Sequence, residues 1–138
     1  MKIRSIVAAA ATTGAILGAG VAIAPAAMAD SICGSGYTQF YSKAVYTTTG
    51  IPAGTVKVFD SPNNYKCAYF TVSTSTKGSD GWGHSINIEP SGGGTAHHDS
   101  GYYNSYAGPV YAGPGCVNVW ASAYGTSDAT WSKNDLCH

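Results

Sequence analysis

The segment CVNVWASAY, residues 116–124, indicates the fold class because its apolar residues recur at every second position. Successive side chains of a β-strand point to opposite faces, so this period places one set inward and the other outward. The set predicted to face the core is aliphatic and small: Val117, Val119, Ala121 and Ala123. The opposite set is aromatic and polar: Asn118, Trp120, Ser122 and Tyr124. The segment therefore predicts a strand with one face on a core.

The same period recurs in other short segments of the chain. It predicts shared inward faces for Val56 with Val58, for Ile86 with Ile88, and for Ala68, Phe70 and Val72. Residues that favour helices are scarce after residue 30, where Leu136 is the only leucine. The predicted strands are Tyr37–Ser42, Val45–Thr49, Thr55–Phe59, Lys66–Ser73, His84–Ile88, Gly101–Tyr106, Pro109–Ala112, Cys116–Tyr124 and Ala129–Ser132. They predict one all-β domain over residues 30–138, a disulfide-stapled antiparallel β-sandwich of about eight strands.

Turn residues separate these segments. Asp60–Asn64 has the composition of a hairpin turn, and Gly92–Gly94 predicts a flexible loop. Gly108-Pro109 and Gly113-Pro114-Gly115 are typical chain-reversal signals on either side of the short segment Val110–Ala112.

The four cysteines, Cys33, Cys67, Cys116 and Cys137, predict two disulfides. Three connectivities are possible. We favour Cys33–Cys67 and Cys116–Cys137, because these pairs join sequence neighbours and close loops of moderate length. Each closure of that size stabilises the fold by roughly 3–4 kcal/mol.

Residues 1–29 have the pattern of a secretory signal peptide. Lys2 and Arg4 precede an apolar stretch, and Ala27-Met28-Ala29 places small residues at the expected cleavage site. The alternative is a membrane anchor, for which the stretch is long enough. Its glycines and Pro25 weaken it as a spanning helix. We therefore expect a secreted protein, located outside the cell or on the cell or spore surface.

The charge of residues 30–138 disfavours two classes of partner. Five lysines remain against seven acidic residues once Lys2 and Arg4 are removed, and no arginine is left. Nucleic-acid binding requires a clustered basic surface, so we expect no nucleic-acid partner. No polybasic cluster is present either, so we expect no membrane partner after leader cleavage.

The aromatic residues that alternate with the core positions are the main candidate for a binding face. If Tyr65, Tyr69, Trp120 and Tyr124 lie on adjacent strands, they form a flat amphipathic platform. Exposed apolar patches of this kind mark interaction sites. The alternative is that loops cover these residues, which then form a second packed layer.

No set of residues in the sequence carries a clear signature of catalysis or metal binding. In His97-His98-Asp99, adjacent histidines of an extended strand point to opposite faces, so they do not readily share an ion, even with His84 or His138 as a further ligand. There is no GxSxG nucleophile motif, and Glu89 is the only glutamate available for a carboxylate pair. We expect a non-enzymatic protein with no metal and no cofactor.

Several segments resemble the spore-associated protein A family, small secreted proteins of spore-forming actinobacteria. The resemblance lies in Cys33-Gly34-Ser35-Gly36-Tyr37, in Cys67, in Asp99–Tyr102, in Tyr106–Tyr111, and in Cys116-Val117 with Trp120. It covers most of residues 30–138, and YAGPVY is its most specific part. Around Trp120 the chain departs from the family, with Ala121-Ser122-Ala123 in place of a more glycine-rich stretch. The resemblance implies association with the spore surface and no catalytic residues.

These observations lead to three functional hypotheses. The first is a structural, surface-associated protein that binds a cell-wall or spore-envelope polymer, with self-association as a further possibility. The second is a proteinaceous hydrolase inhibitor that presents Gly92–Asp99 or the Gly/Pro loop near Cys116. The third is a carbohydrate-binding module.

Overall fold

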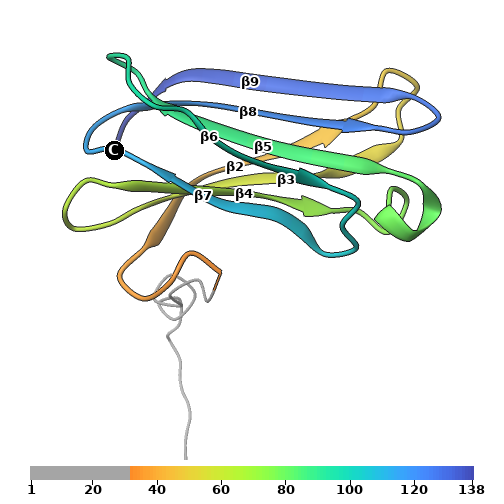
Figure 1. Cartoon of the computed structure of the whole chain (residues 1–138), viewed down its shortest axis with the longest axis horizontal. Helices are drawn as coiled ribbons and strands as arrows, with labels where there is room; N and C mark the ends of the chain where they lie inside the picture. The colour runs from red at the N-terminus through yellow and green to blue at the C-terminus, as the bar shows by residue number, and fades with distance from the viewer. Residues whose placement is uncertain (1–31) are drawn as a thin grey trace, which may run out of the picture.

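The computed structural model describes residues 32–138, which form two antiparallel sheets packed face to face (Figure 1). The first sheet has the strand order β2-β3-β4-β7, and the second sheet has the order β6-β5-β8-β9. The strands are β2 (Thr38–Tyr46), β3 (Pro52–Asp60), β4 (Lys66–Val72), β5 (Gly83–Pro90), β6 (His97–Gly101), β7 (Tyr106–Ala112), β8 (Val117–Tyr124) and β9 (Asp128–Leu136). The predicted all-β sandwich is confirmed. The predicted leader, residues 1–29, lies outside the described residues.

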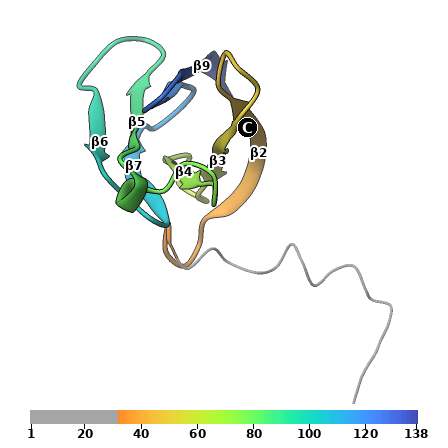
Figure 2. The same cartoon turned by 90° about the vertical axis from the view of Figure 1, so that its right-hand side faces the viewer.

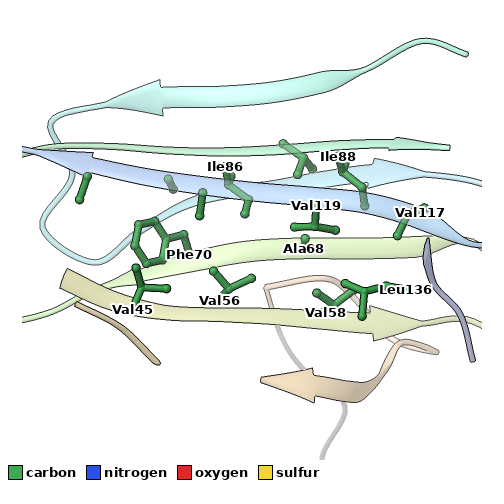
Figure 3. Packing of buried hydrophobic residues seen from close by; sticks show 14 of the residues in the cluster. Val45, Val56, Val58, Ala68, Phe70, Ile86, Ile88, Val117, Val119 and Leu136 are labelled. Atoms are coloured by element: carbon green, nitrogen blue, oxygen red, sulfur yellow. The ribbon is translucent and has the colours of Figure 1, made fainter. Parts of the chain in front are cut away.

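The core lies between the two sheets and contains the inward sets that the period of two predicts. Val56, Val58 and Phe70 of the first sheet lie across from Ile86, Ile88 and the β8 residues of the second sheet (Figure 3). The four predicted inward residues of β8 are at most 2% exposed. Burying one Val, Ile or Phe side chain contributes about 1.5–3 kcal/mol, so this layer supplies most of the apolar stabilisation. Seen end-on, the strands surround the core (Figure 2).

Two disulfides join the predicted pairs. Cys33–Cys67 ties the segment that precedes β2 to β4, and Cys116–Cys137 joins the start of β8 to the residue after β9. No cysteine is free. Two bridges in a domain of this size are typical of an extracellular or otherwise oxidising environment. None of the helical segments within residues 32–138 has the length and apolarity to cross a bilayer.

Two predicted boundaries at the first sheet are wrong. Tyr37–Ser42 and Val45–Thr49 are not separate strands, because β2 runs unbroken from Thr38 to Tyr46, and residues 47–49 belong to the turn that follows it. Gly108-Pro109 does not reverse the chain but lies inside β7. Proline is tolerated there because β7 is an edge strand, and Asp99 Oδ2 accepts the hydrogen bond from Gly108 N at 2.8 Å.

The predicted strand Gly101–Tyr106 is also wrong. The strand lies earlier in the chain, at β6, and residues 102–105 connect the second sheet to the first. In this connection, Tyr103 O accepts a hydrogen bond at 2.7 Å from Gly78 N in the η2 region (Gly78–Asp80), and Ser105 O accepts one at 2.8 Å from Val72 N of β4. Ser79 N donates to the Asn104 side chain at 2.9 Å. Tyrosine-rich composition suggested a strand, but these long-range bonds override it.

Candidate functional site

The structure separates the four residues of the predicted aromatic platform into two pairs. Tyr69 lies on β4 and Tyr65 directly before it, in the first sheet, whereas Trp120 and Tyr124 lie on β8, in the second sheet. The predicted condition, that all four lie on adjacent strands, is not met. The two pairs lie on the outer faces of different sheets, so each face is described separately.

The outer face of the first sheet is a second packed layer around Tyr69. This ring is only 3% exposed and stacks on Phe59 of β3 at 5.5 Å between centroids. The Cys33–Cys67 disulfide belongs to the same buried cluster, and Ile32 and Tyr37 pack against it. The segment before β2 therefore covers this face, as the alternative interpretation of the aromatic residues predicted.

Tyrosines also hold the edges of this layer. Tyr111 Oη donates to the backbone oxygen of Cys33 at 3.0 Å, and its ring lies 5.8 Å from that of Tyr37. Tyr65 is 44% exposed at the rim. The central ring of this layer is therefore buried, whereas Tyr65, Tyr106 and Tyr111 keep between 36% and 44% of their surface exposed around it.

The outer face of the second sheet is organised in rows that run across the strands. Residues directly paired in neighbouring strands share a face, so the registers of β6, β5, β8 and β9 define these rows. The central row is aromatic and polar: His98, Asn87, Trp120 and Ser132. The next row carries four hydroxyl groups: Ser100, Ser85, Ser122 and Thr130. One row further along, Gly83, Tyr124 and Asp128 end the face.

An open hollow of about 310 Å³ lies over β8 and β9 on this face. It is lined by the outward residues Trp120, Ser122, Thr130 and Ser132 and by the pair Ala121 and Trp131, which has the parity of the core set. Trp120 is partly exposed. The hollow thus combines two tryptophans with several hydroxyl groups that can donate or accept hydrogen bonds.

Charged groups lie only toward the ends and one edge of this face. Glu89 accepts a hydrogen bond from Asn118 Nδ2 at 3.2 Å at one end, and Asp128 pairs with Tyr124 at the other. Lys133 is the only lysine of these four strands. It is exposed on the edge strand β9 and pairs in register with the core residue Val119. The centre of the face is therefore suited to an uncharged ligand.

The predicted histidine-rich segment lies at the edge of the same sheet. His97 and His98 are exposed on β6, and Asp99 accepts hydrogen bonds from Tyr103 Oη at 2.6 Å and from Gly108 N. The hydrogen bond to Asp99 raises the pKa of Tyr103 to about 12. Within residues 32–138, no three His, Cys, Asp or Glu side chains are grouped so that they could hold a metal ion. Asp99 thus serves the β6–β7 connection.

Sequence reasoning missed a buried ion pair at one end of the sandwich. Lys66 is fully buried, and its Nζ lies 2.9 Å from Asp60 Oδ1 and 2.6 Å from Asn64 Oδ1. His138 Nδ1 lies 3.2 Å from Asp60 Oδ2. Burial alone raises the pKa of the Asp60 carboxyl, but hydrogen bonds from Lys66 and His138, with their charges, outweigh it and lower the pKa. Position 66 has the same inward parity as Ala68 and Phe70, so the alternation in this strand could have predicted that Lys66 is buried.

His84 is a second buried polar residue inside the sandwich. Its Nε2 lies 3.2 Å from both Thr76 Oγ1 and the backbone oxygen of Ala53. Burial lowers the pKa of its imidazole, and the hydrogen bond with Ala53 offsets part of that change. The position is enclosed, so His84 serves the core and not a surface site.

The two loops predicted for an inhibitor differ in their surroundings. Residues 92–96 form an exposed hairpin loop, whereas His97–Asp99 are paired in β6. Ser91 N, at the start of this loop, donates to the backbone oxygen of the disulfide-bonded Cys116 at 2.9 Å. In the other loop, Gly115 N donates to Asn64 O at 2.9 Å.

No protein-family model, curated protein or solved structure matches this chain. The resemblance to the spore-associated protein A family therefore stays a prediction.

Proposed function

We propose that this protein is a secreted, non-enzymatic protein that binds a neutral polysaccharide of the cell or spore envelope through the outer face of the second sheet. A sugar ring presents C–H groups on its faces and hydroxyl groups around its edge. An aromatic wall beside several hydroxyls matches both features, and the hollow at Trp120 is the single observation that carries the proposal.

Three further observations support the proposed location. The first residues have the pattern of a signal peptide, and the two disulfides suit an oxidising environment. The resemblance to spore-associated protein A is consistent with a spore-forming actinobacterial source and a surface role. Fractionating a culture into medium, mycelial wall and spores, with antibody detection, tests this location directly.

Retention on insoluble polymers tests the binding role. Residues 30–138 are mixed with chitin, cellulose and peptidoglycan, and the bound fraction is measured after washing. We expect retention on at least one polymer and on the order of tenfold weaker retention for Trp120→Ala, because a central aromatic contact is lost. The matched control is Tyr46→Ala, which removes an exposed aromatic side chain from β2 in the first sheet.

Two outcomes contradict the proposal. One is that the wild-type protein is retained on none of the three polymers. The other is that Trp120→Ala and Tyr46→Ala are retained as well as wild type. Melting temperatures measured on the same samples show whether any loss is due to unfolding.

A second candidate function, inhibition of a secreted hydrolase, is favoured by one observation. The exposed loop 92–96 begins at Ser91, which is bonded to Cys116 of a disulfide. However, Gly92, Gly93 and Gly94 must lose much conformational freedom on binding, which weakens the loop as a rigid inhibitory segment. Assaying secreted serine proteases and glycosidases with and without excess protein tests this function; unchanged rates eliminate it for those enzymes.

A further inference from the structure

Tyr124 presents a second exposed aromatic ring on the face that carries Trp120. Tyr124 and Gly83 are paired across β8 and β5, and the tyrosine ring lies over the glycine. A Cβ added at Gly83 would stand 2.2 Å from the Tyr124 ring, so the tyrosine ring can hold this position only because residue 83 is a glycine. Tyr102 meets Tyr124 nearly edge-on, with centroids 6.5 Å apart. Tyr124 is 44% exposed and Tyr102 67% exposed.

The distance between the two stacking positions follows from the strand. Trp120 and Tyr124 lie four residues apart on the same face of β8, which is about 13 Å at roughly 3.3 Å per residue. This span is longer than one sugar ring. The hydroxyl row lies between them, where Ser85 Oγ and Ser122 Oγ are 2.6 Å apart. The order along β8 is therefore aromatic ring, hydroxyl groups, aromatic ring.

We infer that the site binds an internal stretch of a linear, neutral glycan that runs along β8, with one sugar on Trp120 and a later sugar on Tyr124. This inference rests on the proposed function and defines its ligand more narrowly. A single terminal sugar reaches only one of the two rings. A chain of several sugars reaches both and places its intervening hydroxyls over Ser122 and Ser85.

The charges on the face favour a neutral chain over an anionic one. Glu89 and Asp128 lie at its two ends, and Lys133 has the parity of the core set. An anionic polymer would meet carboxylates at both ends, with no lysine among the outward-facing positions between them, so like-charge repulsion disfavours it. Soluble anionic polymers therefore serve as negative controls.

Chain-length dependence tests the inference. Residues 30–138 are titrated by calorimetry with β-1,4-linked oligomers of N-acetylglucosamine and of glucose, from the monomer to the hexamer. We expect the affinity for one series to rise with length until the oligomer spans both rings and then to level off. An affinity that is the same for short and long oligomers overturns the inference.

Variants at the second ring assign this dependence to Tyr124. Tyr124→Ala should bind the longest oligomer on the order of tenfold more weakly, leave the dimer unaffected, and so lose the length dependence. Tyr124→Phe keeps the stacking ring, so its affinity should depend on oligomer length as that of the wild type does. Tyr46→Ala is the control. If Tyr124→Ala fails to fold, Tyr102→Ala, which removes only the edge contact, should show a smaller loss of the same kind.

The outcomes separate this inference from the proposed function. If Trp120→Ala abolishes polymer retention but Tyr124→Ala binds every oligomer as wild type does, the inference is overturned and the proposed function stands. If the wild type binds neither polymer nor oligomer, both are overturned. Binding of an anionic polymer in preference to the neutral series also overturns the inference.

Discussion

The outer face of the first sheet carries Phe59 and Tyr69 beneath the segment that precedes β2, whereas the outer face of the second sheet carries Trp120 beside an open hollow. In both sheets, outward residues alternate along the strands with residues of the same core. Both outer faces have aromatic residues at positions where many sandwiches have charged ones. The difference arises from Cys33–Cys67, which holds a short segment over one face. Aromatic residues on an outer face are thus structural where the chain covers them and available for binding where it does not.

Removing the covering disulfide should have the largest effect on this comparison. For Cys33→Ala with Cys67→Ala, we expect a loss of about 3–4 kcal/mol in the free energy of unfolding, because a separation of 34 residues is no longer closed. Chemical denaturation measures the loss, and binding of an apolar dye should rise as Tyr69 becomes uncovered.

The second disulfide provides the matched control. Cys116→Ala with Cys137→Ala opens a shorter separation of 21 residues and leaves the cover over Tyr69 in place. Its stability loss should be slightly smaller, without increased dye binding. Equal dye binding by the two double variants would show that the segment before β2 does not protect the first sheet.

Truncating one aromatic residue on each face sharpens the contrast. Tyr69→Ala should lower the free energy of unfolding by about 3 kcal/mol, because it leaves a cavity beside Phe59 and the disulfide. Trp120→Ala should lower it by about 1 kcal/mol or less, since Trp120 is partly exposed at an open hollow. Equilibrium denaturation of both variants measures the difference. A loss at Trp120 equal to that at Tyr69 would mean that both faces are structural.

The smallest expected effect concerns His84, which lies in the interior and belongs to neither outer face. Burial lowers the pKa of its imidazole below the ordinary 6.5, so the unfolded chain takes up a proton at higher pH than the folded chain does. This contribution to stability is complete above pH 6.5 and is lost as the pH falls toward the folded-state pKa. The melting temperature should therefore fall as the pH drops below 6.5, and less steeply for His84→Gln.

The carboxyl group of Asp60 also has a shifted pKa, but it affects stability over a different pH range. The pKa of Asp60 is lowered from 3.8, so its contribution to stability is lost only at more acidic pH, as the pH falls through the folded-state pKa. Equal slopes for wild type and His84→Gln between about pH 7 and about pH 5 would contradict the role given to His84.

The site was predictable only in part. The alternation in residues 116–124 identified Trp120 and Tyr124 as outward residues, and the same rule applied to β5 indicates Ser85 and Asn87. It did not indicate that these strands are neighbours, because β5 pairs with β8 across two intervening strands. It also grouped Tyr69 with Trp120, although β4 and β8 belong to different sheets.

Local sequence determined the strand faces and most of the aliphatic core of this protein, and it favoured the two disulfide pairings among three. Side-chain alternation depends only on neighbouring residues, and each cysteine pair joins sequence neighbours. Tertiary structure alone decided which strands share a sheet, that Lys66 is buried with Asp60, and which aromatic face is covered. These features depend on contacts between residues far apart in the chain, whose pairing no local pattern specifies.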